Sequence, residues 1–64
     1  MEFKVIDGFF EISQDRETGH IEVTKYGDIV REIESKRLLN VDELHGLLIG
    51  IRTAYFAGGN ENEQ

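Results

Sequence analysis

The chain has no cysteine, no proline and no tryptophan, and it has no long hydrophobic run. Without cysteine there is neither a disulfide nor a thiolate-bound zinc site, and the composition fits a reducing compartment. No window approaches the roughly 18–20 apolar residues of a membrane span. The first residues, Met1–Lys4, lack the basic, apolar and small-residue order of a signal peptide. We therefore expect a soluble, cytoplasmic protein.

The small size limits the stability of the fold. A chain of 64 residues forms at most one domain, and such a domain buries only about 60% of the surface that its unfolded chain exposes. Its core rarely supplies more than about 3–5 kcal/mol without reinforcement. We expect a second copy of the chain to reinforce it. We also expect a single α+β domain over residues 1–59, a disordered polar tail over residues 60–64, and no cofactor or metal.

The charge is strongly acidic: 7 lysines and arginines stand against 13 aspartates and glutamates, a formal net charge of -6. A surface of this charge repels the phosphate backbone of nucleic acids. It attracts basic surfaces, so a basic or protein partner is favoured. The alternative interpretation is that the charge serves solubility alone.

The N-terminal segment predicts a β-hairpin. The dipeptide Asp7-Gly8 separates two β-rich runs and is typical of a two-residue turn of type I′. This turn would place Ile6 opposite Phe9, and the pairs farther from the turn follow in register. One face of the hairpin is then apolar, while Ile6 and Phe9 remain on the other. The apolar face is predicted to hold Phe3, Val5, Phe10 and Ile12.

A third strand is predicted after this hairpin. Residues 14–19 form a polar loop that ends in glycine. The segment His20–Tyr26 follows, and its alternation and β-rich composition indicate a strand. Ile21 and Val23 share one face of this strand. A turn is expected at residues 27–28.

The segment from Asp28 to Leu39 fits either a fourth strand or a helix. As a strand that follows a three-residue loop, it pairs Ile21 with Ile33 and sets Glu22 opposite Glu32. As a helix, it would begin at a capping aspartate and gain one i,i+4 ion pair. The strand is favoured, because three strands alone leave a small sheet.

The clearest element is a C-terminal helix. Asn40 is a good N-cap, and Glu43 stands at capping-box spacing. The helix is predicted to run to Phe56 or Ala57 and to stop at the glycine pair 58–59. The apolar residues at helical spacing are Val41, Leu44, Leu47, Leu48, Ile51 and Tyr55. The predicted fold is therefore α+β: a small antiparallel β-meander of three or four strands with this helix packed on the sheet.

Two features of the helix predict a homodimer. Ile49 and Phe56 lie beyond the apolar arc, where one small sheet can hardly cover them. The alternative is that Phe56 folds back over the edge of the sheet and that Ile49 is simply exposed. Gly46, Gly50 and Ala54 form a stripe of small residues on the opposite side. Each mid-helix glycine costs about 1 kcal/mol relative to alanine, so the stripe suggests either a close approach by a partner or a tolerated solvent face. The predicted interface comprises Ile49, Phe56, Gly46 and Gly50.

The residues do not predict catalysis. His20 has Glu22 on its strand face, and His45 has Asp42 and Glu43 nearby on the helix. A catalytic histidine also needs a nucleophile within hydrogen-bond reach, and no convincing one accompanies either histidine. We expect a non-enzymatic protein.

The acidic residues suggest an interaction surface instead. Carboxylates in a row beside exposed apolar residues can imitate a DNA backbone and plug a DNA-binding cleft. A small acidic dimer that binds and inhibits another protein, encoded by a phage or another mobile element, is the favoured hypothesis. The predicted partner-binding residues are Ile6, Phe9, Glu22, Tyr26, Glu32 and Glu34.

The alternative hypothesis rests on the basic cluster of Arg31, Lys36 and Arg37, with Lys25 nearby. Such a cluster beside aromatic residues on a sheet could track single-stranded nucleic acid in a DNA-binding or transcription-regulatory dimer. Glu32 and Glu34 interrupt the cluster, which favours a solvated charged surface.

The predicted order of elements is similar to that of two groups of small dimeric proteins. One group is the transcription-coactivator type of single-strand DNA binder. The other is the small acidic phage inhibitor of uracil-DNA glycosylase, which this chain resembles in size and charge as well. The resemblance is one of layout and implies no role for an individual residue.

Overall fold

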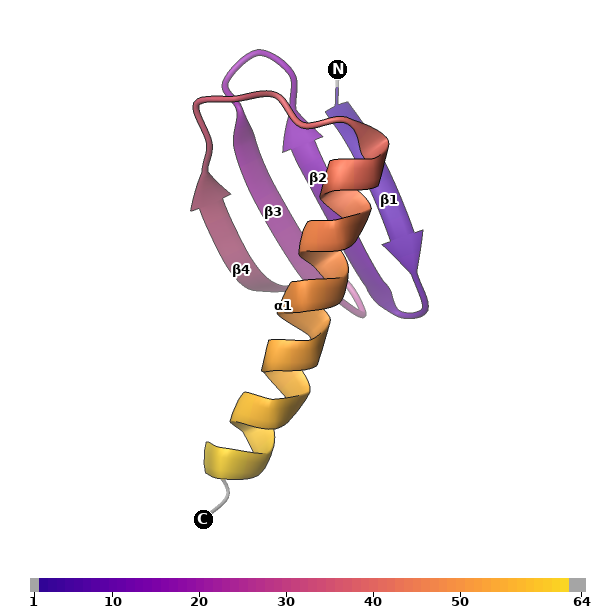
Figure 1. Ribbon diagram of the computed structural model, residues 1–64, viewed down its shortest axis with the longest axis vertical. Helices are drawn as coiled ribbons and strands as arrows, with labels where there is room; N and C mark the ends of the chain where they lie inside the picture. The colour runs from indigo at the N-terminus through magenta and orange to yellow at the C-terminus, as the bar shows by residue number, and fades with distance from the viewer. Residues whose placement is uncertain (1, 63–64) are drawn as a thin grey trace.

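The computed structural model describes the backbone of residues 2–62 and the side chains of residues 2–57. Its elements are β1 (Glu2–Asp7), β2 (Phe10–Asp15), β3 (His20–Lys25), β4 (Asp28–Glu34) and α1 (Val41–Asn62). The strands form one antiparallel sheet in the order β1-β2-β3-β4, and the helix packs on it (Figure 1). The predicted α+β meander with a C-terminal helix is confirmed, with the fourth strand present.

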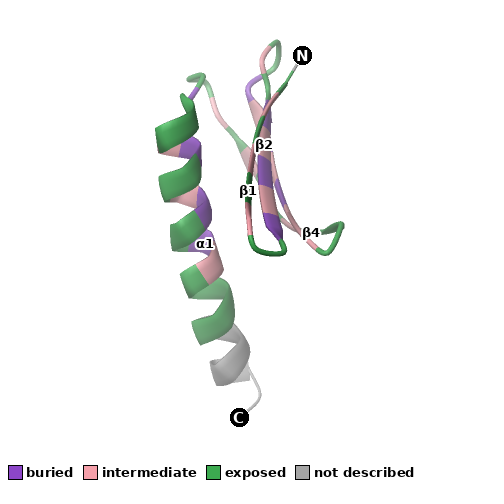
Figure 2. Ribbon diagram, turned by 90° about the vertical axis from the view of Figure 1, so that its right-hand side faces the viewer, coloured by how far each residue is buried: buried purple, intermediate pink, exposed green. Residues whose placement is uncertain are grey.

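The helix covers one face of the sheet. It lies mainly over β1 and β2, and no described element covers the opposite face (Figure 2). We call the covered face the inner face and the uncovered face the outer face. Strand residues alternate between the two because successive side chains point to opposite sides. The core between the inner face and α1 consists of Phe10, Ile12, Ile21, Val23, Leu39, Leu44, Leu48 and Ile51.

The first hairpin turn lies one residue later than predicted. Its central residues are Gly8 and Phe9, so Asp7 pairs with Phe10 and Ile6 does not pair with Phe9. Gly8 has a φ of +67°. A positive φ at the first central residue alone is the pattern of a type II′ turn, for which glycine is suited in that position. The predicted register is therefore wrong. The predicted faces are nevertheless confirmed, because the shift changes each pairing by two residues.

The predicted polar loop over residues 14–19 is too long. Strand β2 extends through Asp15, and Gln14 is a buried residue of its inner face. The loop closes at Gly19, which has a φ of +84°. A Cβ at this position would also overlap the carbonyl oxygen of Ser35, so both the backbone angle and the space require glycine.

The hairpin of β3 and β4 has a tighter turn than predicted, and its second strand contains a bulge. Its central residues, Tyr26 and Gly27, have φ angles of +53° and +86°, the pattern of a type I′ turn. Strand β3 therefore ends before Tyr26, and the predicted three-residue loop is wrong. An extra residue, Val30, stands between the paired residues Ile29 and Arg31 of β4. This bulge compensates for the shorter turn, so the predicted pairings of Ile21 with Ile33 and of Glu22 with Glu32 are confirmed.

The helix begins where predicted and ends later. The Glu43 N–H donates to Asn40 Oδ1 at 2.8 Å, and the Asn40 N–H donates to Glu43 Oε1 at 3.0 Å, which completes the capping box. The predicted stop at residues 58–59 is wrong, since α1 continues to Asn62. Glycine accepts helical backbone angles at a cost of about 1 kcal/mol, and no proline follows to end the helix. Residues 63–64 of the predicted tail lie outside the described residues. The helical residues that the structure describes contain no stretch long and apolar enough to cross a bilayer.

Candidate protein-interaction surface

The outer face of the sheet is open and acidic. Among the described residues, Lys4 is the only lysine or arginine that the strand register places there. The apolar side chains Ile6 and Ile29 lie on the same face, near the hairpin turns, and both are exposed. The glutamates of this face are Glu2, Glu11, Glu22, Glu32 and Glu34.

Arginines elsewhere in the chain are held by other contacts. Arg37 Nη1 donates to Glu43 at 2.9 Å, and Arg52 Nη1 donates to Asp7 at 3.1 Å. Arg16 Nη1 donates to a carbonyl oxygen of the linker between β4 and α1 at 2.8 Å. These three cations therefore do not neutralise the outer face.

His20 is the titratable cation of the outer face. Its Nδ1 lies 2.5 Å from Glu34 Oε2, and its Nε2 lies 3.5 Å from Glu32 Oε1. The hydrogen bond to Glu34 raises the pKa of His20, and the negative charges of Glu34, Glu32 and Glu22 raise it further. Protonation of His20 thus offsets part of the acidic charge at this end of the sheet.

Glu22 and Glu32 lie directly opposite each other on β3 and β4. Like charges in this arrangement repel and destabilise a sheet. The pair therefore opposes the stability of the isolated chain while it concentrates negative charge on the β3–β4 side of the outer face.

An exposed aromatic pair adjoins the acidic face. The two hairpin turns lie at the same end of the sheet (Figure 1), and the Tyr26 N–H donates to the Phe9 carbonyl oxygen at 3.0 Å. The rings of Phe9 and Tyr26 stack with centroids 4.7 Å apart and an interplanar angle of 17°. Phe9 is 48% exposed and Tyr26 is 73% exposed. The stacked rings thus form a largely solvent-exposed apolar projection.

The backbone of Tyr26 is unusual for so large a residue. Among the described residues, it is the only one other than glycine with a positive φ. The left-handed region costs a non-glycine residue about 1–2 kcal/mol. Asparagine before glycine would suit this type I′ turn better. Backbone strain of this kind clusters at functional sites, so Tyr26 is a candidate functional residue.

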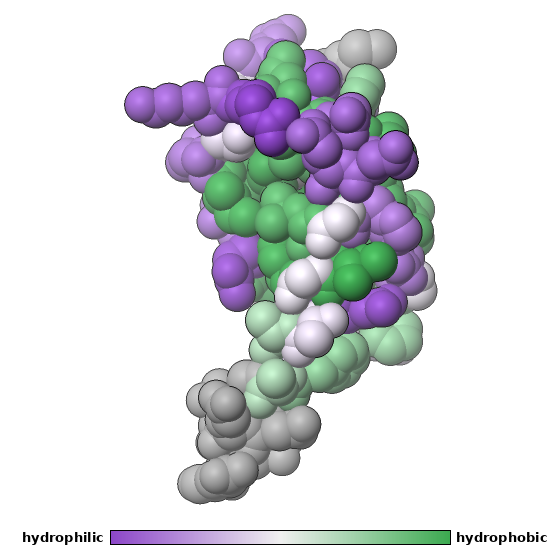
Figure 3. Space-filling model, viewed as in Figure 1, coloured by the Kyte–Doolittle hydropathy of each residue, from purple (hydrophilic) through white to green (hydrophobic). Residues whose placement is uncertain are grey.

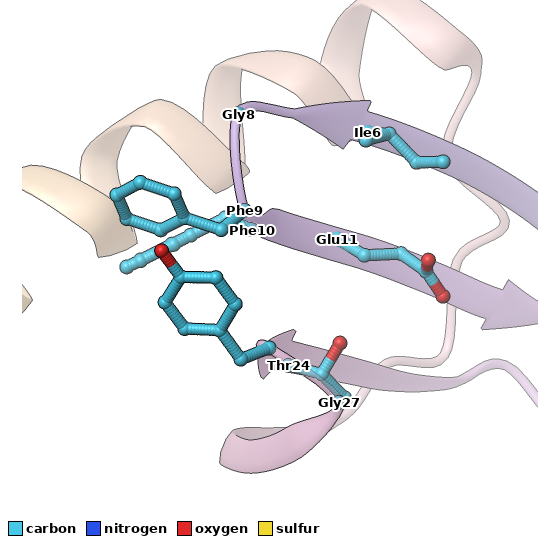
Figure 4. Close-up of a pocket in the computed structure, with 8 residues that line it drawn as sticks. Ile6, Gly8, Phe9, Phe10, Glu11, Thr24 and Gly27 are labelled. Carbon is cyan, nitrogen blue, oxygen red and sulfur yellow. The ribbon is translucent and has the colours of Figure 1, made fainter.

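A shallow hollow of about 480 Å³ opens beside the aromatic pair. Figure 4 shows Phe9 at the turn, with Ile6 and Glu11 side by side on β1 and β2. The hollow thus combines aromatic and aliphatic side chains with one carboxylate. Its lining residues are Ile6, Gly8, Phe9, Phe10, Glu11, Thr24, Tyr26 and Gly27.

The structure brings the predicted partner-binding residues onto one side of the molecule. Ile6, Phe9 and Tyr26 line the hollow. The other three, all glutamates of β3 and β4, lie on the same outer face farther from the turns. Sequence reasoning did not include Glu11 among the partner-binding residues. It also missed Ile29, because the bulge that turns this side chain outward has no local signal in the sequence.

The predicted dimer residues are exposed in the single chain. Ile49 is 38% exposed and Phe56 is 47% exposed, although the Phe56 ring also packs 5.8 Å from the buried Phe10 ring. A Cβ at Gly46 or Gly50 would have no atom within 4 Å among the described neighbours. Within one chain, these glycines therefore face open space, and their predicted role in a dimer stays a prediction.

Viewed from the helix side, hydrophobic residues gather where α1 crosses the sheet, and hydrophilic ones gather around the start of the helix (Figure 3).

Asp7 links the first hairpin to the helix, a role that the sequence did not reveal. Its carboxylate lies 3.1 Å from His45 Nε2 and 3.1 Å from Arg52 Nη1. The hydrogen bond with His45 lowers the pKa of Asp7, and Arg52 lowers it further. His45 therefore pairs with Asp7 and not with the helix carboxylates proposed from the sequence.

Among the described residues, no cluster of three or more histidine, aspartate or glutamate side chains is arranged to hold a metal ion.

Gln14 is the second residue whose role the sequence did not reveal. It is fully buried, and its side-chain NH₂ donates to the carbonyl oxygens of Gly19 and Arg37, each at 3.0 Å. Its Oε1 accepts from Arg16 at 3.1 Å and from the Leu39 N–H at 2.8 Å. Every hydrogen-bonding position of this amide is thus used to join β2 to the following loop and to the linker before α1.

The basic cluster of the alternative hypothesis is divided. Arg37 is held by Glu43, and Arg31 pairs with Val23 on the inner side of β4. Lys36 follows the end of β4 in the linker. The cluster therefore does not share a surface with the Phe9–Tyr26 pair.

Comparison of this chain with protein-family models, with curated proteins and with solved structures finds no match. The resemblance to two groups of dimeric proteins therefore rests on the order of the elements alone, and for the phage inhibitor also on size and charge.

Proposed function

We propose that this protein is a non-enzymatic interaction module of the cytoplasm that binds a basic protein through its outer face. The observation that carries this proposal is the combination found there: an uncovered, acidic sheet face beside an exposed aromatic pair. Interfaces of this kind use charge for steering and specificity and use a few large side chains as anchors.

The electrostatic part of the proposal rests on how the charges are distributed. The outer-face glutamates have one lysine among them, while Arg37 and Arg52 are paired elsewhere. A one-sided negative field attracts a basic partner and orients it before contact. The repulsion between Glu22 and Glu32 strengthens that field at the expense of stability.

The anchoring part rests on Phe9 and Tyr26. Aromatic residues are enriched among the side chains that dominate binding energy, especially where they are packed against apolar neighbours. The stacked rings are already ordered by each other and by the backbone hydrogen bond between their turns. Little side-chain entropy is then lost when a partner covers them.

We further propose that the module acts as an inhibitor and as a homodimer. A cleft that binds DNA is lined by basic residues, and an acidic sheet with an apolar projection is suited to block it. Ile49 and Phe56 remain the proposed contacts between the two copies, because both are exposed on the helix. The small size of the core supports reinforcement by a second copy.

The experiment compares two double variants that remove the same charge. Glu22→Gln with Glu32→Gln neutralises the β3–β4 side of the outer face. Glu17→Gln with Asp42→Asn neutralises two carboxylates in the β2–β3 loop and the first turn of α1. Immobilised wild-type and variant proteins are exposed to a lysate of source cells, and captured proteins are quantified by mass spectrometry.

The proposal predicts a basic protein that the wild type and the Glu17–Asp42 control capture and that the Glu22–Glu32 variant loses. Equal loss in both variants would mean that net charge alone governs capture. Equal capture by all three would mean that the outer face is not the binding surface. Either result would contradict the proposal.

A further inference from the structure

We infer that the hollow beside Phe9 and Tyr26 is a binding site for an arginine side chain of the basic partner. This inference rests on the proposed function and adds to it the chemical group that the partner inserts. The hollow lies where the acidic face meets the aromatic pair, so it offers both attraction for a cation and an apolar surface.

The lining of the hollow suits the two parts of an arginine side chain. Ile6 is 65% exposed and offers an apolar contact for the methylene stem. Phe9 and Tyr26 offer aromatic surface for the planar guanidinium, which stacks on rings more readily than an ammonium group does. Thr24 of β3 adds a hydroxyl to the lining.

Glu11 is the carboxylate of the lining, and in Figure 4 its side chain extends away from Phe9, on the opposite side of the hollow. Its Oε2 lies 3.5 Å from Lys4 Nζ, and both side chains are substantially exposed. This separation exceeds a good charge-assisted hydrogen bond, so the exposed carboxylate is free to turn toward the rings and to accept a bidentate pair from a guanidinium there. Lys4 also lies 3.9 Å from Glu2, so it can shift toward that second carboxylate.

The chain shows related contacts within itself. The guanidinium carbon of Arg16 lies 3.9 Å from the centroid of the Phe3 ring, on the inner side of the sheet. Lys25 Nζ lies 5.8 Å from the Tyr26 ring and 5.1 Å from the Tyr55 ring. Aromatic rings of this protein thus accept cations, and the Tyr26 ring already has the Lys25 ammonium beside it.

The backbone of Tyr26 provides independent support. A large aromatic side chain in the left-handed region is unfavourable for the isolated chain, and its ring is largely exposed. The ring position nevertheless completes the wall of the hollow. A ligand that contacts this wall would account for an aromatic residue where asparagine suits the turn better.

The test is an NMR titration of the isotopically labelled protein with a blocked Gly-Arg-Gly peptide. Peptides with citrulline or lysine in place of arginine serve as matched probes, since citrulline keeps the shape of arginine without its charge. We expect the arginine peptide to shift the backbone amides around the hollow, from Ile6 to Glu11 and from Thr24 to Gly27. The lysine peptide should bind less tightly, and the citrulline peptide should produce no such shifts.

Two variants test the lining without damage to the fold. Glu11→Gln should weaken the arginine peptide by about tenfold, the effect of removing a charge-assisted hydrogen bond. Tyr26→Asn should abolish the localised shifts while it keeps a favoured residue before Gly27 in the turn. Glu17→Gln removes the same charge as Glu11→Gln outside the hollow and should leave the affinity within about twofold. A dispersed spectrum confirms that each variant is folded.

The inference is overturned if the arginine and citrulline peptides shift the same amides equally. It is also overturned if the shifts lie around Glu22, Glu32 and Glu34 instead, or if Glu11→Gln and Glu17→Gln have equal effects. The two proposals can fail separately. A partner lost from the Glu22–Glu32 variant, with no peptide in the hollow, would leave only the interaction surface. A peptide bound in the hollow, with no partner that depends on Glu22 and Glu32, would leave only the arginine site.

Discussion

The two ends of the sheet are built differently. At one end, which we call the linker end, the loop of residues 16–19 meets the linker of residues 35–40. There Gln14 uses all its hydrogen-bonding positions, and the capping box closes the start of α1. At the other end, the turn end, the two hairpin turns expose a pair of stacked rings.

The linker end stabilises the fold, whereas the turn end presents side chains to a partner. Buried polar groups at the linker end are satisfied, and Gly19 fits a position that no other residue could occupy without strain. At the turn end, Tyr26 occupies an unfavourable backbone region and remains exposed. Toward the middle of the outer face, Glu22 and Glu32 repel each other. We therefore expect substitutions at the linker end to unfold the protein and substitutions at the turn end to change binding.

The largest effect is expected at Gln14. Gln14→Ala leaves the carbonyl oxygen of Gly19 and the N–H of Leu39 without their side-chain partner, while the Arg37 carbonyl oxygen still accepts from the Ser35 hydroxyl. Each unsatisfied buried group costs about 1–3 kcal/mol, so the free energy of unfolding should fall by about 3 kcal/mol or more. Urea denaturation measures the change, with Ser13→Ala on the outer face as the control. A loss below about 1 kcal/mol would contradict the role of Gln14 as the link between loop and linker.

Glycine substitutions sharpen the comparison between the two ends. Gly19→Ala should destabilise the protein by more than about 2 kcal/mol, because a positive φ and an overlap with the Ser35 carbonyl act together. Gly27→Ala at the turn end has the same sign of φ but open space around it. Its cost should be only about 1 kcal/mol. If urea denaturation shows equal losses of unfolding free energy for the two variants, position 19 at the linker end accepts a side chain as well as position 27 at the turn end does.

Alanine at Gly46 and Gly50 tests the proposed dimer. Because a Cβ at either position meets open space, each substitution should stabilise the helix of a single chain by about 1 kcal/mol. Light scattering on the double variant shows whether the dimer survives. Monomers at a concentration where the wild type is dimeric would place these glycines in the interface. Persistent dimers would remove them from it, and a wild type that is itself monomeric would contradict the proposed dimer.

A smaller effect is expected from His20. Its raised pKa means that the folded state holds the proton more tightly than the unfolded state does. The resulting stabilisation is present below the ordinary pKa of about 6.5 and is lost as the pH rises through the raised value. His20→Gln should therefore flatten the decline of stability between about pH 6 and pH 8. Denaturation at a series of pH values measures this slope, and an unchanged slope would mean that the contacts with Glu34 and Glu32 contribute nothing.

Local patterns in the sequence were sufficient to predict the fold. Alternation fixed the faces of the strands, and the spacing of Asn40 and Glu43 located the start of the helix. The pairing of Ile21 with Ile33 was also correct, although the predicted loop was one residue too long and the bulge at Val30 restored the register. Periodicity therefore identified which side chains share a face, but not how each turn is closed.

Contacts between distant residues explain what the sequence did not reveal. Asp7 belongs to a strand and pairs with His45 and Arg52, which lie 38 and 45 residues away. Gln14 accepts a hydrogen bond from Leu39, which lies 25 residues away. Neither contact has a local signature. The same reasoning applies to the candidate site, where Ile6, Phe9 and Tyr26 were predicted to belong to one partner-binding surface, but their arrangement around one hollow required the structure.

The most direct test of the account measures partner capture by Tyr26→Asn alongside its stability. The favoured left-handed backbone of asparagine should offset the loss of the stack with Phe9, so stability should change by less than about 1 kcal/mol. We expect this folded variant to lose the basic partner that the wild type captures. Capture at the wild-type level by the folded variant would contradict the proposal that the aromatic pair and the acidic outer face form a binding surface.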